Sequence, residues 1–198
     1  MTGSPLVVKF GGSLLRSIPD LIPVLRSSRN PLLIVPGGAL FADAVRSARV
    51  TDDHAAHWMA IAAMEQYGML LETNGLGSTY QLAVPETTRV LLPYCILRKI
   101  DPLPHLWDVT SDTIAAWVAD YLGLDLLVLK SVDGIMSDGV LIETVNSRME
   151  SDTVDPSFLS YVLDRKIRTT IINGSSRDRV AGYLDGEAVP GTRIGTTF

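Results

Sequence analysis

The stretch Val7-Val8-Lys9-Phe10-Gly11-Gly12-Ser13 joins a short apolar run to a lysine, two glycines and a serine. The apolar residues favour a strand, and the glycine pair allows a sharp turn in which a ligand can approach bare backbone amides. The serine can cap a helix that follows. Amides at a helix start bind anions, and Lys9 adds a positive charge beside them. The stretch therefore predicts a phosphate-binding turn, although a plain tight turn with a solvated lysine explains the same residues.

The composition of the 198-residue chain fits one domain over residues 1–198. Hydrophobic residues make up 46% and charged residues 20%, which supports a sizeable core and argues against disorder. The net charge is −5 and no run of lysines or arginines occurs, so nucleic acid and anionic membranes are disfavoured as partners. The single cysteine, Cys95, excludes an internal disulfide framework and is expected to be a small buried residue.

Signals for export and for metal binding are also missing from the sequence. No apolar run reaches the length of a membrane span, and the N-terminus lacks the charged and apolar regions of a signal peptide. The three histidines lack zinc-finger spacing, and no cysteine cluster supports them. We therefore expect a cytoplasmic protein that does not bind membranes.

Apolar runs alternate with helical patterns along the chain. Strands are predicted at 6–10, 32–35, 90–93, 126–129 and 169–172, and helices at 19–27, 39–48, 52–71, 111–122 and 156–163. Several strands are apolar on both faces, as in sheets covered by helices on each side. The order predicts an α/β fold, a three-layer α/β/α sandwich with an open, mainly parallel sheet. The segment 74–100 is expected to be irregular or to form an edge hairpin.

Glycine turns follow four of the predicted strands. They are Gly11-Gly12, Gly37-Gly38, Asp133-Gly134 and Asn173-Gly174. Taken singly, each is explained as a turn. Ligands of parallel α/β sheets bind at the carboxyl ends of the strands, and all four turns fall there. Their shared position therefore supports a phosphate site.

Five motifs resemble those of the amino acid kinase superfamily, in the same order and over nearly the whole chain. They are Lys9-Phe10-Gly11-Gly12-Ser13, Pro36-Gly37-Gly38, Thr110-Ser111-Asp112, Ser131-Val132-Asp133-Gly134-Ile135 and Gly191-Thr192-Arg193-Ile194. The resemblance implies an open α/β/α sandwich and an ATP-dependent phosphotransferase. It also implies ATP with Mg2+ as the donor, and homo-oligomers built on dimers.

A closer likeness connects the chain to the small archaeal-type kinases of methanofuran biosynthesis. It rests on Ala56–Ile61, on Met64–Gly68 and on Trp107-Asp108-Val109-Thr110-Ser111-Asp112. This resemblance implies a small-molecule phosphorylated acceptor, (aminomethyl)furanmethanol phosphate, which is converted to its diphosphate.

Roles for the first motif and for Asp112 follow from the chemistry of phosphoryl transfer, which needs aligned oxygens and stabilised charge. The resemblance implies that Lys9 neutralises phosphate oxygens while the amides of Gly11, Gly12 and Ser13 hold the donor's phosphates. Asp112 would orient Lys9 and reach the magnesium ion. The alternative is that Asp112 only stabilises the start of the predicted helix.

The segment Lys130-Ser131-Val132-Asp133-Gly134 looks like the nucleotide loop of the superfamily. Lys130 could supply a second catalytic cation, or it could be a strand-end lysine in solvent. Asp138 stands where relatives often contact the ribose or adenine, but a turn residue is an equal explanation. Many relatives also carry a glycine-glycine-methionine segment followed by a lysine, and residues 145–156 lack it. Lys130 is therefore a candidate for that lysine's role, and acetylglutamate and aspartate kinase activities are disfavoured.

The acceptor site has fewer sequence signals. Gly37 and Gly38 would let the acceptor lie close to backbone amides. Cations for its phosphate could come from Arg16, Arg46, His54 or His57. The two histidines share a helix face, where a partly protonated ring could bind phosphate, although one packed and one exposed histidine explain the pair as well. The apolar residues Trp58, Met59, Met64 and Tyr67 fit a core or a dimer interface, or a wall against a furan ring.

The sequence leaves two alternative functions open. The acceptor could be another phosphate such as isopentenyl phosphate; uridylate is disfavoured because no base-reading loop is evident. A non-catalytic nucleotide-binding protein could also use this fold, because fold alone does not determine function. The presence of both Lys9 and Asp112 argues against a non-catalytic role.

Overall fold

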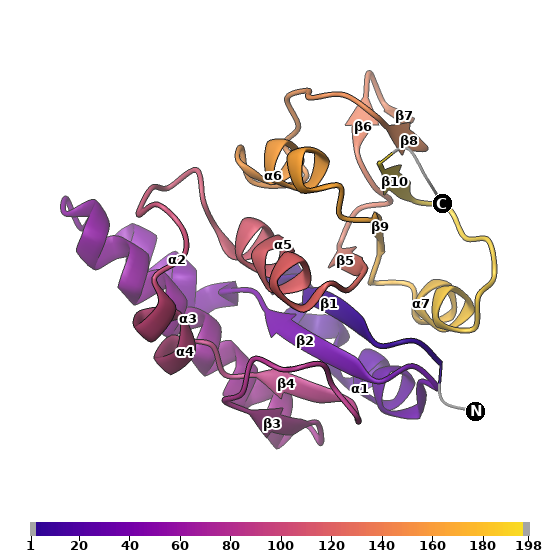
Figure 1. Cartoon of the computed structure of the whole chain (residues 1–198), viewed down its shortest axis with the longest axis horizontal. Coiled ribbons are helices and arrows are strands. Elements are labelled where there is room, and N and C mark those ends of the chain that lie inside the picture. The colour runs from indigo at the N-terminus through magenta and orange to yellow at the C-terminus, as the bar shows by residue number, and fades with distance from the viewer. Residues whose placement is uncertain (1–2, 196–198) are drawn as a thin grey trace.

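The computed structural model describes residues 3–195, which form a three-layer α/β/α sandwich around an eight-stranded sheet (Figure 1). The strands are β1 (Leu6–Phe10), β2 (Leu32–Pro36), β3 (Gly77–Thr79), β4 (Arg89–Leu91), β5 (Leu126–Lys130), β8 (Thr144–Val145), β9 (Thr169–Asn173) and β10 (Thr192–Ile194). Their order is β3-β4-β2-β1-β5-β9-β10-β8, and every neighbouring pair is parallel except β9 with β10. The predicted fold class and mainly parallel sheet are confirmed.

Helices cover both faces of this sheet, and a two-stranded hairpin stands beside it. The helices are the 3-10 helix η1 (Gly12–Ser17), α1 (Ile18–Ser27), α2 (Ala39–Ser47), α3 (Asp53–Thr73), α4 (Tyr94–Ile100), α5 (Ser111–Leu122), α6 (Phe158–Arg165) and α7 (Arg177–Leu184). The hairpin pairs β6 (Met136–Ser137) with β7 (Val140–Leu141). Within residues 3–195, no helix is long and apolar enough to cross a bilayer.

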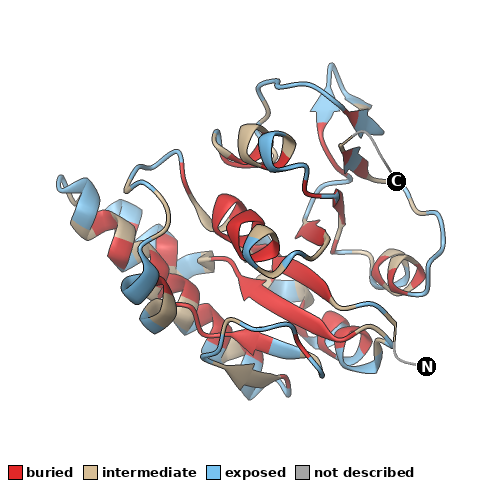
Figure 2. Cartoon of the chain, viewed as in Figure 1, coloured by how far each residue is buried: buried red, intermediate tan, exposed pale blue. Residues whose placement is uncertain are grey.

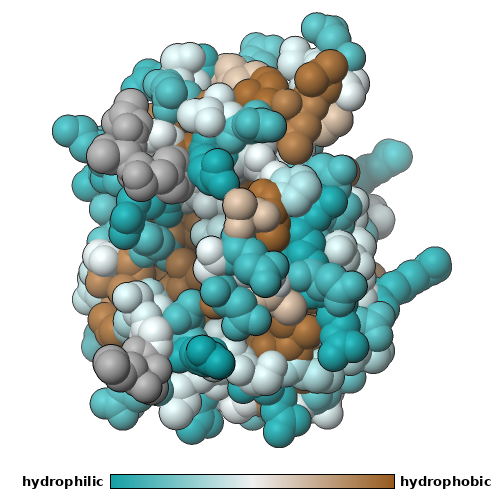
Figure 3. Space-filling model, turned by 90° about the vertical axis from the view of Figure 1, so that its right-hand side faces the viewer, coloured by the Kyte–Doolittle hydropathy of each residue, from teal (hydrophilic) through white to brown (hydrophobic). Residues whose placement is uncertain are grey.

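Side-chain alternation along the strands builds two cores, one on each face of the sheet (Figure 2). Val7 and Val128 belong to the core under α5 and α6, whereas Val8 and Leu129 belong to the core under α1 and α7. The central strands are buried on both faces, as their continuous apolar runs predict. The side of the molecule that carries α7 is mostly hydrophilic, with only separate apolar patches (Figure 3).

Several local predictions are wrong. Residues 74–100 do not form an edge hairpin, because β3 and β4 run parallel to each other and extend the sheet beyond β2 before α4 begins. Residues 80–88, between these two strands, are irregular. Ser13 does not cap a helix: it lies inside η1, which starts after Gly11 without any side-chain cap. Cys95 is exposed rather than buried, because it lies on the outer side of the short helix α4.

Candidate active site

The sheet places two lysines under the start of α5. Lys9 on β1 pairs in register with Val128 on β5. Lys130 also lies on β5, two residues after Val128. Side chains two residues apart in a strand point to the same face, so both lysines project toward α5. Lys9 is only 3% exposed, and Lys130 is partly buried.

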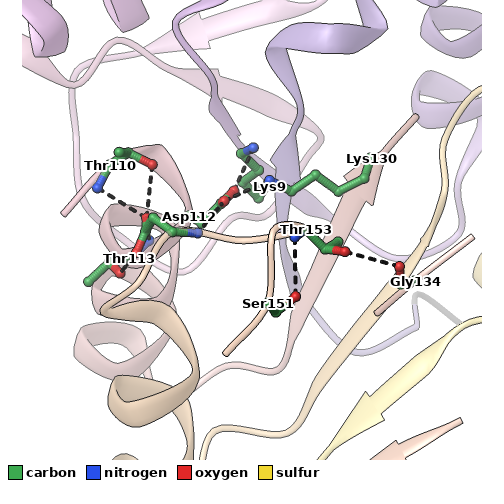
Figure 4. Close-up of polar contacts among 9 residues, drawn as sticks. Lys9, Thr110, Asp112, Thr113, Lys130, Gly134, Ser151 and Thr153 are labelled. Carbon is green, nitrogen blue, oxygen red and sulfur yellow. Dashed lines mark hydrogen bonds and ion pairs between the residues drawn. The ribbon is translucent and has the colours of Figure 1, made fainter. Parts of the chain in front are cut away.

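Asp112, in the first turn of α5, binds both lysines (Figure 4). The Lys9 ammonium lies 2.6 Å from Asp112 Oδ1, and the Lys130 ammonium donates to Asp112 Oδ2 at 2.6 Å. The backbone N–H of Asp155 donates to the same Oδ2 at 3.3 Å. The aspartate is 3% exposed, so one buried carboxylate balances two cations and one positive charge is left over. A site with this surplus suits an anionic ligand.

The ionisation of the three groups follows from this packing. Burial raises the pKa of Asp112, but the charges of Lys9 and Lys130 outweigh burial and leave it below its ordinary value. Burial, together with the charge of Lys9, lowers the pKa of Lys130 to about 8. Lys130 is therefore largely protonated at pH 7, but it loses its charge at mildly alkaline pH.

Asp155 holds the start of α5 in place and was not predicted from the sequence. Its Oδ2 accepts hydrogen bonds from the Thr110 backbone N–H at 3.0 Å, the Thr110 hydroxyl at 2.9 Å and the Thr113 backbone N–H at 3.0 Å. Thr110, expected to cap this helix, makes no side-chain cap itself and donates to Asp155 instead. Burial and the neighbouring charge of Asp112 raise the pKa of Asp155. Asp155 is followed by a proline just before α6, and this Asp-Pro pair was the sequence signal that could have indicated its role.

The first two glycine turns pack against each other. A Cβ atom on Gly37 would come within 2.7 Å of the Gly12 nitrogen, so glycine is needed for the two backbones to meet. The Gly11 N–H donates to the Leu129 carbonyl at 3.0 Å, and the Gly37 N–H donates to the Phe10 carbonyl at 2.8 Å. These two amides are hydrogen-bonded to carbonyls of the protein and are not available to a ligand. Of the amides predicted to hold phosphate, those of Gly12 and Ser13 remain candidates.

A groove runs between these turns and the start of α5, and we call it the lysine groove. Its lining includes Lys9, Gly11, Gly12, Ser13, Gly38, Arg46, Ser111, Asp112 and Lys130. Ala39, at the start of α2, also lines the groove. Its φ is 45°, a backbone conformation that residues other than glycine rarely adopt. Strained backbone of this kind is concentrated at functional sites. The structure thus brings together all three predicted catalytic residues and most of the first glycine turns.

The predicted nucleotide loop follows Lys130 and is anchored by its neighbours. The Asp133 carboxylate accepts hydrogen bonds from the Asn173 amide at 3.0 Å and from Arg179 at 2.6 Å, and these bonds lower its pKa. The Gly134 carbonyl accepts from Thr153 (Figure 4), and the hydroxyl of Thr192 on β10 accepts from the Ile135 N–H. Ser131 and Val132 are left exposed.

Asp138 lies apart from the lysine groove. It occupies the tip of the β6–β7 hairpin with a φ of 51°, and it does not line the groove. Its contact with adenosine therefore stays a prediction.

An apolar pocket opens beside the lysine groove and shares part of its wall. The shared residues are Gly38, Ala42, Arg46, Thr110 and Ser111. The rest of the pocket is lined mainly by α3 and by the segment before α5: Asp53, Ala56, His57, Ala60, Ile61, Met64, Leu106, Trp107, Val109 and Ile114. Two ligands bound in these adjoining hollows would meet at the shared wall.

The three histidines form one cluster next to this pocket. His54 Nδ1 lies 2.7 Å from His105 Nδ1, and the His57 ring stacks on His105 with centroids 4.2 Å apart. His105 also contacts the Asp101 carboxylate at 2.7 Å. Burial, followed by the charge of His105, lowers the pKa of His57 to about 4. His57 lines the pocket as a neutral ring at pH 7, so a charge-based role in phosphate binding is disfavoured.

The other apolar residues singled out in the sequence divide between core and surface. Trp58, Met64 and Tyr67 are buried, whereas Met59 is 41% exposed. Met64 lines the apolar pocket, and the Tyr67 hydroxyl donates to the Gly11 carbonyl at 3.4 Å. Tyr67 thus connects α3 to the first glycine turn.

Comparison with known proteins supports the resemblance. No protein-family model matches the sequence. The chain is 27% identical over 201 residues to [5-(aminomethyl)furan-3-yl]methyl phosphate kinase from Methanocaldococcus jannaschii, with 91% of this chain and 93% of the relative covered.

Solved structures with the same fold are also kinases of small phosphates. Uridylate kinase from Archaeoglobus fulgidus has a TM-score of 0.75 at 21% identity, covering 96% of this chain and all of the other. UMP kinase from Ureaplasma parvum has a TM-score of 0.70 at 16% identity, covering 99% and 100%. An isopentenyl phosphate kinase in complex with substrate has a TM-score of 0.63 at 18% identity, covering 97% and 100%. The chain therefore has the fold of the amino acid kinases, and the resemblance that its motifs carry is confirmed.

Proposed function

We propose that this protein is an ATP-dependent kinase that phosphorylates [5-(aminomethyl)furan-3-yl]methyl phosphate to the corresponding diphosphate. The observation that carries the proposal is the buried Lys9–Asp112–Lys130 cluster, which faces a groove walled by glycine turns. The relative from Methanocaldococcus jannaschii, which is named for its activity on this acceptor, supports the choice of substrate. The adjoining apolar pocket supports a reaction between two bound molecules.

In the proposed reaction, an oxygen of the acceptor's phosphate attacks the γ-phosphorus of ATP. The bond from that phosphorus to the β,γ-bridging oxygen breaks, and ADP leaves with the bond's electrons. Lys9 and Lys130 neutralise the charge that spreads over the transferred group, which is the main requirement of phosphoryl transfer. Asp112 acts as a positioning residue, because its two oxygens hold the two ammonium groups in place.

The chain's own residues do not fit a protein-held magnesium site. Both oxygens of Asp112 are occupied by ammonium groups. Elsewhere in residues 3–195, no group of three or more His, Cys, Asp or Glu side chains is placed to hold a metal ion. We therefore propose that Mg2+ enters bound to the ATP phosphates and that Asp112 is not one of its ligands.

The acceptor would occupy the apolar pocket with its phosphate toward the shared wall. Arg46 borders both hollows, and its guanidinium is held by Asp43 at 2.7 Å. A guanidinium at this junction suits a phosphate that must lie next to the γ-phosphate of ATP. The apolar lining to which Ile61, Met64 and Trp107 contribute suits an aromatic furan ring.

We also propose a homo-oligomer. The long helix α3 exposes Met59 and Met69, at 41% and 43%, on the same side as the small residue Ala62. Apolar side chains at this spacing are typical of helix pairing across an interface. Light scattering of the purified chain measures the oligomeric state.

An assay with purified protein tests the proposed function. The protein is mixed with MgATP and, in separate reactions, with the aminomethylfuran phosphate, isopentenyl phosphate or uridine monophosphate. ADP release and the mass of the product are measured. We expect a diphosphate from the furan acceptor with kcat/KM at least tenfold above that of either alternative. ATP binding without a product from any acceptor would overturn the proposal in favour of a non-catalytic protein.

The low pKa of Lys130 predicts proton uptake when ATP binds. The phosphates favour the charged ammonium and raise its pKa from about 8, so the binding site gains a proton wherever Lys130 was neutral. At pH 8.5 we expect roughly 0.5–0.8 proton per ATP, and at pH 6.5 close to none from this group. ATP affinity should accordingly fall as the pH rises through 8. Calorimetric titrations in buffers with different ionisation enthalpies measure the uptake.

Two variants make this measurement specific. Lys130→Met should abolish the uptake at pH 8.5, whereas Lys99→Met, at an exposed position on α4, should keep it. Equal uptake in wild type and Lys130→Met would assign the proton to another group.

A further inference from the structure

The segment 101–109, between α4 and α5, forms part of the wall of the apolar pocket. Leu106, Trp107 and Val109 of this segment line the pocket together with residues of α3. Leu106 is 50% exposed and Trp107 is 42% exposed, so both side chains face the pocket with another part of their surface in solvent. Core packing therefore does not fix this wall by itself, and its position depends on contacts elsewhere in the segment.

His105 supplies such contacts, because its ring meets α3 on several sides. Its Nδ1 lies 2.7 Å from Nδ1 of His54, and its ring stacks on His57 with centroids 4.2 Å apart. It also meets the indole of Trp58 edge to face, with centroids 5.2 Å apart. Within the segment, its Nε2 contacts the Asp101 carboxylate at 2.7 Å. The His105 side chain is only 17% exposed, although the residues on either side of it are exposed.

The contact between the two Nδ1 atoms limits the charge that this cluster can carry. Two ring nitrogens 2.7 Å apart share one proton, so at least one of the His54 and His105 rings is neutral. Asp101 favours a proton on His105, and a charged His57 would oppose one. A second proton would remove the hydrogen-bond acceptor and place two charged rings in contact. The other charged side chains beside the cluster are Arg98 on α4, 4.6 Å from the Trp58 ring, and Asp52 and Asp53 at the start of α3.

We propose that His105 is a positioning residue for acceptor binding, because it fastens the segment 101–109 to α3 and so sets the wall made by Leu106 and Trp107. Without this contact, the acceptor must hold the segment in place as it binds, and the cost appears in the KM for the acceptor. The segment does not line the lysine groove, so ATP binding does not carry that cost. This inference rests on the proposed function, which places the acceptor in the apolar pocket.

Steady-state kinetics of four variants test this role. His105→Leu removes both polar contacts, and we expect the KM for the furan acceptor to rise about 5- to 10-fold while kcat and the KM for ATP stay within twofold. His54→Leu removes the partner on α3 and should have a similar effect, and the double variant should do no more than either. Asp108→Asn, at an exposed position of the same segment that lines neither hollow, should keep the wild-type constants.

The pH dependence separates fastening from simple packing. Histidine rings that are released into water take up protons below about pH 6.5, so acid favours the released segment by up to about tenfold per pH unit. The ratio of the acceptor KM in His105→Leu to that in the wild type should therefore fall from about 5–10 at pH 7.5 to about 2 at pH 5. Because both enzymes use the same acceptor, the ionisation of its phosphate cancels in this ratio. A side chain that only fills space would give the same ratio at both pH values.

The outcomes distinguish this inference from the proposed function. An acceptor KM in His105→Leu within twofold of the wild type, additive effects in the double variant, or a ratio that does not change with pH would overturn the role of His105 and leave the kinase intact. A rise in the KM for ATP as large as that for the acceptor would also overturn it. If His105→Leu does not fold, His54→Leu provides the same comparison from the α3 side. A wild type that phosphorylates no acceptor overturns the proposed function itself.

Discussion

Lys9→Met is expected to lower kcat about 10²- to 10³-fold while the protein remains folded. Methionine keeps the length of the side chain but cannot neutralise charge on the transferred phosphoryl group. Lys130 and the glycine turns remain, so the KM for ATP should rise much less than kcat falls. Asp112 keeps one cationic partner, Lys130, and is not left as an unpaired buried charge. Steady-state kinetics with the furan acceptor measure both constants.

A second measurement tests whether Lys9 acts as part of the cluster that it forms with Asp112 and Lys130. The charge of Lys9 lowers the pKa of Lys130, so Lys9→Met should raise that pKa. The variant should then take up less proton than the wild type when ATP binds at pH 8.5. Lys99→Met serves as the matched control and should change neither kcat nor proton uptake. A folded Lys9→Met enzyme with kcat within threefold of the wild type would contradict the assignment of Lys9.

Most of the groove could be predicted from local sequence, because parallel α/β sheets put their ligand sites at the ends of strands. The strand at 6–10 and the helix at 111–122 are confirmed to the residue. Lys130 could be named as a candidate, but its burial could not. That depends on the register between β1 and β5 and on α5 covering this face of the sheet, both of which are tertiary properties.

The residues that were missed act across long sequence separations. Asp155 caps a helix that begins 44 residues earlier, and its role becomes visible only when α5 and α6 pack together. His105 contacts His54 and stacks on His57, although it lies 51 and 48 positions after them in the chain. The two histidines on α3 could therefore be grouped from the sequence, but their partner could not. The predicted glycine pairs line or adjoin the groove, but two of their amides are used by the turns themselves. Local motifs therefore indicated the candidate groove, whereas packing decides which of its atoms are free to bind a ligand.

Asp112→Asn is expected to destabilise the protein by about 3–5 kcal/mol at pH 7. Asparagine keeps the shape and an acceptor for the Asp155 N–H, but it removes the charge that balances Lys9 and Lys130. The two buried ammonium groups then repel each other, and the pKa of Lys130 falls further. Because the repulsion requires both charges, the variant should recover stability as the pH rises and Lys130 loses its proton. The wild type gains less stability over the same range, because the pKa of Lys130 is lowered less there than in the variant, so the difference between the two should shrink from pH 7 to pH 9.5.

Urea unfolding of a double variant separates this charge effect from a simple loss of packing. Lys130→Met removes one of the two repelling cations, so Asp112→Asn with Lys130→Met should be more stable than Asp112→Asn alone. Turnover should remain low in both, because Lys9 is no longer held in position by a carboxylate. If Asp112→Asn unfolds within 1 kcal/mol of the wild type, or if the second substitution restores nothing, Asp112 does not balance the two lysines. A loss of stability that stays the same from pH 7 to pH 9.5 would point to packing rather than charge as the function of this side chain.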